Sequence, residues 1–168
     1  YVGGLFTTAG GKTANRIAKA QALIAQLAVT GQGVSIASGA TTPNSSNDTD
    51  FGSVNLGSSP VVHTFTLNNN GSVDLTVSAI STSGGNASDF VSSGLPLPAT
   101  ITAGGSATFN VTFTPSAVGV RTTTLTIASN DPNTPNYTFA LQGTGVDLTP
   151  TDTPTATETP TDTPTDTP

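Results

Sequence analysis

The chain of 168 residues contains no Cys, no Trp and no Met. Without cysteine the fold has no disulfides, and this absence excludes neither a reducing nor an oxidising compartment. Because Met is missing, Tyr1 is not a translation start, and we expect a processed chain or a piece of a longer product. With Tyr1 and Tyr137 as the only tyrosines, the sequence also offers no obvious aromatic platform for a sugar.

Charged residues are scarce and unevenly placed. Four Lys and Arg stand against ten Asp and Glu, which gives a net charge of -6. Lys12, Arg16 and Lys19 give residues 1–31 a charge of +3, whereas the remainder holds Arg121 against all ten acids. Three cations are too few for a surface that follows a phosphate backbone, so we expect no nucleic-acid partner.

Long hydrophobic runs are also missing, and none reaches the roughly 20 residues that a membrane-spanning helix needs. The run ALIAQLAV follows the three cations and resembles the apolar part of a signal peptide. This run is short and Gln26 interrupts it, so a signal peptide is the minor interpretation. We therefore expect no insertion into a membrane.

The sequence between Gly33 and Val146 alternates apolar and hydroxylated residues, as in HTFTLNN, ATFNVTFTP, TTLTIAS and YTFALQG. Turn residues interrupt this alternation about every ten residues, which predicts an all-β, antiparallel sandwich of seven or eight strands. The expected strands cover residues 34–38, 50–55, 61–69, 73–82, 98–102, 106–114, 119–129 and 136–145. The expected core contains Phe65, Leu67, Leu75, Val77, Phe90, Phe109, Val111, Phe113, Leu125, Ile127, Phe139 and Leu141.

Three segments of this region carry a more specific signal: NNNGSVDLTVSAI, SGGNASDF and ITAGGSATFNVTFTPSAVGVRTTTLTIASNDPNTPNYTFALQGTG. In order and spacing they resemble immunoglobulin-like domains of the ASH/Hydin and choice-of-anchor D type, which are related in fold to major sperm protein. The resemblance covers about two thirds of the chain and implies an immunoglobulin-like fold. It implies no shared active site, because such domains serve as spacers, assembly modules or surface adhesins.

The first 31 residues do not follow the alternating pattern. YVGGLF is a strand candidate, and the stretch from Thr13 to Gly31 predicts a helix with an apolar face that contains Ile17, Ile24 and Leu27. YVGGLFTTAGGKTANRIAK also resembles one repeat of the propeller-type arrays of secreted bacterial proteins, in which IAK would lie on a strand. The expected organisation is an extension over residues 1–31, the sandwich over 32–147 and a tail over 148–168.

The tail, TPTDTPTATETPTDTPTDTP, has too little apolar surface to form a core and should be extended. Its composition is typical of O-glycosylated stalks, and the alternative is a bare linker to a wall anchor. Six N-glycosylation sequons also occur, at Asn44, Asn47, Asn70, Asn86, Asn110 and Asn136. The glycosylation candidates are Thr149, Thr151, Thr153, Thr155, Thr157, Thr159, Thr161, Thr163, Thr165, Thr167, Asn70, Asn86 and Asn136.

Residues that could support catalysis or metal binding have simpler structural interpretations. His63 is the only histidine and lies on the same side of its strand as Phe65, which favours a partly buried structural role over catalysis. Asp48 and Asp50, the closest acid pair, fit turn capping better than a glycosidase pair. The loops NDTD and SNDPN have too few charged ligands for calcium. Arg121 should pair with a carboxylate, and we expect no catalytic residue, metal or cofactor.

Two classes of function agree with these features. The first is an extracellular or cell-surface structural subunit that assembles head to tail with other copies of itself into a fibre and carries covalent glycans on its tail. In that case residues 1–31 would dock on the sheet edge of the next copy, whereas docking on their own sandwich would satisfy them within one molecule. The alternative is a monomeric adhesin or carbohydrate-binding module on the stalk of a larger surface protein.

Overall fold

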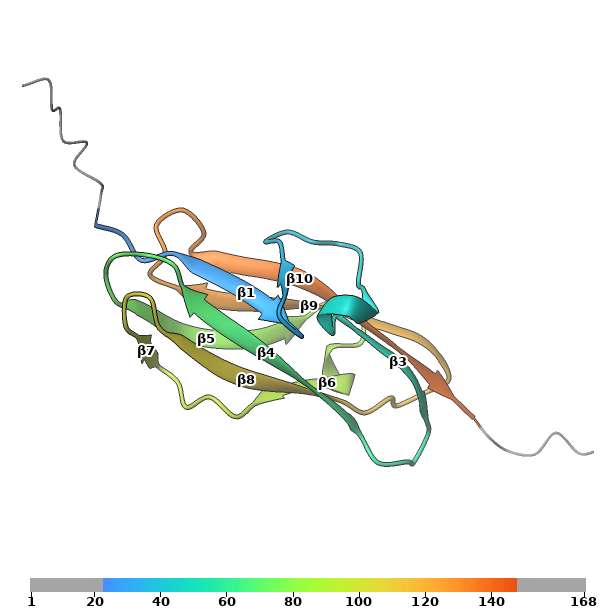
Figure 1. The fold of residues 1–168 in the computed structure, drawn as a ribbon. Coiled ribbons are helices and arrows are strands. Elements are labelled where there is room, and N and C mark those ends of the chain that lie inside the picture. The colour runs from blue at the N-terminus through green and yellow to red at the C-terminus, as the bar shows by residue number, and fades with distance from the viewer. Residues whose placement is uncertain (1–22, 148–168) are drawn as a thin grey trace, which may run out of the picture.

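The computed structural model describes residues 23–147, which form ten β-strands in two five-stranded sheets packed face to face (Figure 1). This confirms the predicted immunoglobulin-like, all-β sandwich. The first sheet has the order β2-β1-β4-β8-β6, with β1 Leu27–Gly31, β2 Val34–Ile36, β4 Val61–Asn69, β6 Phe90–Ser93 and β8 Ser106–Phe113. The second has the order β3-β10-β9-β5-β7, with β3 Asp50–Asn55, β5 Leu75–Ser83, β7 Ala99–Ile101, β9 Gly119–Ser129 and β10 Asn136–Val146.

The core lies between the two sheets and follows from the alternation of side chains along each strand. In β8, for example, Phe109, Val111 and Phe113 are buried, while Thr108 is exposed and Thr112 is half-buried. All twelve residues expected in the core are buried. The core also contains Ala25, Leu27, Val29, Ile36, Phe51, Val54, Ile101 and Tyr137.

The number and direction of the strands need two corrections. All eight expected strands are present, but β1 and β6 were not expected, so the described residues hold ten strands. β6 has only four residues, too few for an alternating pattern to stand out in the sequence. The sandwich is also not wholly antiparallel, because β3 runs parallel to β10.

The prediction of a helix that ends at Gly31 is wrong at its C-terminal end, because Leu27–Gly31 form strand β1. β1 lies between β2 and β4, with Val29 opposite Leu67. The sandwich therefore starts before the expected boundary at residue 31. Ile17 and the other expected helical positions before residue 23 lie outside the described residues. Within residues 23–147 no helix is long and apolar enough to cross a membrane.

The described chain enters the sandwich before β1 and leaves it after β10, at opposite ends (Figure 1). We call these the leading end and the trailing end. At the leading end the Leu27 amide donates to Oδ2 of Asp131 at 2.9 Å, and the Ser72 amide donates to the carbonyl of Ile24. At the trailing end the Leu56 amide donates to the carbonyl of Val146. Both ends of the described chain are thus tied to neighbouring segments.

Candidate functional sites

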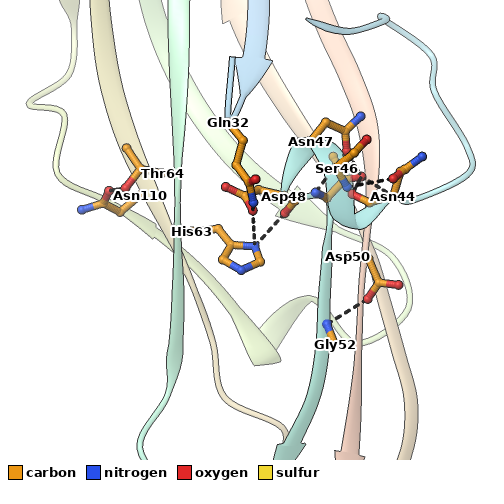
Figure 2. A network of polar contacts seen from close by, with 11 residues as sticks. Gln32, Asn44, Ser46, Asn47, Asp48, Asp50, Gly52, His63, Thr64 and Asn110 are labelled. Atoms are coloured by element: carbon orange, nitrogen blue, oxygen red, sulfur yellow. Dashed lines mark hydrogen bonds and ion pairs between the residues drawn. The ribbon is translucent and has the colours of Figure 1, made fainter. Parts of the chain in front are cut away.

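His63, on β4, faces the loop that leads into β3 (Figure 2). Its Nδ1 lies 2.8 Å from the backbone carbonyl of Asp48 and 3.8 Å from the Asp48 carboxylate. The ring stacks on Phe51, with centroids 4.2 Å apart. Because a carbonyl oxygen only accepts hydrogen bonds, Nδ1 carries the proton. These partners include no Ser, Thr or Cys that His63 could activate as a base, and the contacts fit the structural role predicted for this histidine.

The two nearby acids both act within turns. Asp48 follows the 3-10 turn η1 (Ser45–Asn47) with φ at 62°, and its carboxylate accepts a hydrogen bond from the Gln32 side chain. Asp50 accepts from the amide of Gly52 at 2.9 Å (Figure 2). The Asp50 carboxylate therefore caps a local turn, as predicted. The Asp48 carboxylate instead contacts the Gln32 side chain, and the backbone amide of Asp48 closes the turn on the carbonyl of Ser45.

Asp89 and Arg121 form the closest ion pair among the described residues. Asp89 ends the 3-10 turn η2 (Ala87–Asp89), and its side chain is 1% exposed. The Arg121 Nε lies 2.7 Å from Oδ2 of Asp89, and the Ser116 amide donates to the same oxygen at 3.2 Å. Burial raises the pKa of Asp89, but the hydrogen bonds from Arg121 and Ser116 outweigh it, so this pKa lies below its ordinary value. The pairing predicted for Arg121 is confirmed.

The two loops considered for calcium use their oxygens internally. Asp131, in SNDPN, accepts from the Leu27 amide through Oδ2 and from the Asn133 amide through Oδ1. Asn47, in NDTD, accepts from the Thr49 hydroxyl at 2.7 Å. Among residues 23–147, no three His, Cys, Asp or Glu side chains are grouped so that they could hold a metal ion.

The N-glycosylation candidates occupy different environments. Asn70 is exposed between β4 and β5, and Asn136 is exposed at the start of β10. Asn86 is half-buried, and its Oδ1 accepts from the Thr122 amide at 3.1 Å. Asn110 lies on the outer face of β8, where it accepts from the Thr64 hydroxyl (Figure 2). The ten threonine candidates from Thr149 to Thr167 lie outside the described residues, and glycosylation stays a prediction at every position.

The buried side chains that hold the leading end were not among the residues predicted from the sequence. Asn69 is 1% exposed, accepts from the Gly71 amide, and donates to the carbonyls of Val73 and Ile101. Its position on β4 has the same parity as Phe65 and Leu67. A polar residue at an inward-facing position must find partners, and this parity was the available signal.

The two packed sheets define an immunoglobulin-like β-sandwich. More specifically, the chain belongs to the HYDIN/CFA65/VesB-like family of Ig-like domains, whose family model matches residues 44–144. The match confirms the resemblance drawn from the sequence. The search of curated proteins found no match to this chain.

Several solved structures are similar in fold. A Porphyromonas gingivalis W83 protein of unknown function is 14% identical, with a TM-score of 0.52; the similarity covers 71% of this chain and 46% of that one. VesB protease from Vibrio cholerae is 14% identical, with a TM-score of 0.44 and coverage of 71% and 31%. The ASH/PapD-like domain 7 of human CEP192 is 16% identical, with a TM-score of 0.40 and coverage of 56% and 81%. This chain thus spans less than half of the first two proteins.

Proposed function

We propose that this chain is a non-enzymatic, extracellular structural module that assembles end to end with other copies of itself into a fibre. The observation that carries the proposal is the passage of the described chain from one end of the sandwich to the other (Figure 1). A domain whose connections leave at opposite ends places its neighbours in a row. Connections at the same end would instead fold the neighbours back on one another.

The contacts made by the histidine and aspartate side chains support a non-enzymatic role. His63 is held by Asp48 and Phe51, and Asp89 is held by Arg121 and Ser116. These groups stabilise the fold through backbone and side-chain partners that a substrate would have to displace. Asp131 is likewise committed to backbone amides.

The contact between copies is proposed to come from residues 1–22. This segment carries all three cations outside the sandwich, whereas residues 23–147 hold Arg121 against six acids. Opposite charges favour docking of the segment on a sandwich, and the short edge strands β2, β6, β3 and β7 can accept an added strand. Docking on the next copy is a heterologous contact, which forms an open filament when its rotation does not close.

The experiment is electron microscopy of the negatively stained full chain and of a variant that lacks residues 1–22. We expect fibres from the full chain and dispersed particles from the variant, which keeps every described residue of the sandwich. Thermal unfolding of the variant provides the control, because its cooperative transition must remain. Fibres that persist without residues 1–22, or a full chain that stays monomeric at high concentration, would contradict the proposal.

The tail of residues 148–168 is proposed to carry O-linked sugars and to be exposed outside the cell. Thr residues that alternate with Pro in an extended chain are accessible from all sides, as in the stalks of surface glycoproteins. The scarcity of charge and the richness in hydroxyls within the sandwich fit the same environment. The mass of the chain tests this proposal, as argued in the Discussion.

A further inference from the structure

An uncharged groove of about 440 Å³ lies on the outer face of the second sheet, over the central strands β9 and β10. Its volume falls within the range of about 300–1,000 Å³ that is common for small-molecule sites. The floor consists of Thr122 and Thr124 on β9 and of Thr138, Ala140 and Gln142 on β10. The walls consist of Gly39, Ala40, Thr41 and Pro43 on one side and of Gly84 and Gly85 on the other.

Backbone hydrogen bonds fix one wall to the floor, and a close approach of the backbone fixes the other. The Gly39 amide donates to the carbonyl of Thr138 at 2.7 Å, and the Ala140 amide donates to the carbonyl of Ala40 at 2.8 Å. On the other side, a Cβ on Gly85 would lie 2.2 Å from the carbonyl oxygen of Thr122, so only glycine allows this close approach. The groove is therefore formed before any ligand arrives.

The chemistry of the lining selects a neutral ligand rich in hydroxyls. No lining residue is ionisable, and the Phe139 side chain faces the core, where it is 1% exposed. Thr hydroxyls both donate and accept. The Nε2 of Gln142 donates to Oδ2 of Asp50 at 3.4 Å, which leaves the amide oxygen and the second N–H for a ligand. The Thr methyl groups, the two alanines and Pro43 add small apolar surfaces that can contact the C–H groups of a sugar ring.

Two other classes of ligand fit less well. A peptide that binds by strand addition needs free backbone groups, but β9 and β10 are each paired on both sides over most of their length. A cation would favour an anion, but Arg121, the one Lys or Arg among residues 23–147, is paired with Asp89. We propose that this groove binds a short neutral oligosaccharide.

The test is isothermal titration calorimetry of the unglycosylated full chain with maltotriose, cellotriose, mannotriose and N-acetylchitotriose. We expect at least one of these neutral trisaccharides to bind. Thr122→Val and Thr124→Val each keep the side-chain shape and remove one hydroxyl, and each should weaken binding by roughly three- to tenfold, as expected for the loss of one hydrogen bond.

Thr108→Val is the matched control, since Thr108 is an exposed threonine on β8 of the opposite sheet. This variant should bind the trisaccharide within about twofold of the parent. Binding of none of the four trisaccharides overturns the proposal. An equal loss of affinity in the control and in the groove variants overturns it as well.

The oligosaccharide has two possible sources, a polysaccharide outside the chain or a glycan on the tail of another copy. A second titration, with the chain as glycosylated by its natural host, distinguishes them. Weaker binding than to the unglycosylated chain indicates occupation by tail glycans, and equal binding indicates an external polysaccharide; either result supports the groove. The groove lies between the two ends of the sandwich, so failure of this test leaves the fibre proposal unaffected.

Discussion

Phe113 shows how closely single residues are fitted in this core. Its ring is fully buried, stacks on Phe90 with centroids 4.7 Å apart, and lies 5.7 Å from the ring of Phe51. A Cβ on Gly143, in the facing sheet, would lie 2.4 Å from the Phe113 ring. The glycine therefore provides the space that the aromatic ring fills, and even a methyl group there would require the core to shift.

Asp89 should make the stability of the fold depend on pH. Its pKa is lower in the folded state than in the unfolded state, so its contribution to stability is present above the unfolded pKa of about 3.9. This contribution is lost as the pH falls from there through the folded pKa. We expect Asp89→Asn to be less stable than the parent at pH 7, and the difference between their free energies of unfolding to shrink below about pH 4.

Urea denaturation of both proteins at pH 7, 4 and 2.5 measures this difference. Asp74→Asn is the control, because Asp74 is exposed in the loop before β5 and its substitution should change stability little. A difference between parent and Asp89→Asn that stays constant over this range would show that the ion pair with Arg121 does not act as argued.

Core residues were more predictable than polar partners, for a physical reason. Phe109, Val111 and Phe113 follow a local period of two, which a sequence displays directly. The contact of His63 with the Asp48 carbonyl depends on how a loop of another sheet crosses β4. No local pattern encodes that crossing, so the sequence predicted that His63 would be structural but not which residue holds it.

Among the elements, β1 was the one assigned to the wrong type of structure. Leu27 and Val29 alternate with Ala28 and Thr30, but the preceding alanines, together with Ile24, also fit a helical period. So short a segment satisfies both patterns, and tertiary contacts decide between them. Here the deciding contacts are the ladder to β4 and the hydrogen bond from the Leu27 amide to Asp131.

Removal of β1 should therefore destroy the fold, in contrast to removal of the segment before it. A variant that lacks residues 1–31 loses Leu27 and Val29 from the core, and Asn69 and Asp131 each lose one backbone partner. Leaving Oδ2 of the buried Asp131 without the Leu27 amide adds about 1–3 kcal/mol to the cost of the lost apolar contacts. We expect no cooperative transition in circular dichroism of this variant.

The variant that lacks only residues 1–22 keeps these contacts and should melt within a few degrees of the parent. The two truncations thus test the placement of β1 directly. If the shorter protein, without residues 1–31, unfolds cooperatively near the parent temperature, β1 is dispensable and its assignment to the first sheet is wrong.

At the scale of the whole molecule, the architecture was predictable and the connections between its parts were less so. β3, β4 and β9 have the bounds expected from the sequence, because turn residues mark both of their ends. The parallel pairing of β3 with β10 and the contact of the Gly39–Ala40 wall with β10 join residues about a hundred positions apart. Such contacts depend on the packing of complete sheets, and a local pattern carries no information about them.

The mass of the whole chain tests the proposed glycosylation of the tail. The bare polypeptide has a mass of 16.6 kDa. We expect intact mass spectrometry of the chain from its natural host to give a larger mass, in steps of single sugars, and proteolysis to place the added mass between Thr149 and Thr167. A chain produced without glycosylation is the control. A mass equal to that of the polypeptide would contradict the proposal.

The path of the chain from the leading end to the trailing end also determines how the domain would respond to tension. A force on the two ends pulls β1 and β10 in opposite directions, along their own axes. Hydrogen bonds between strands lie across these axes, so the force shears the bonds of β1 with β4, and of β10 with β3 and β9, all together. Peeling a strand would break its bonds one at a time and would need far less force. We therefore expect a row of such domains to bear stretching with its sandwiches intact.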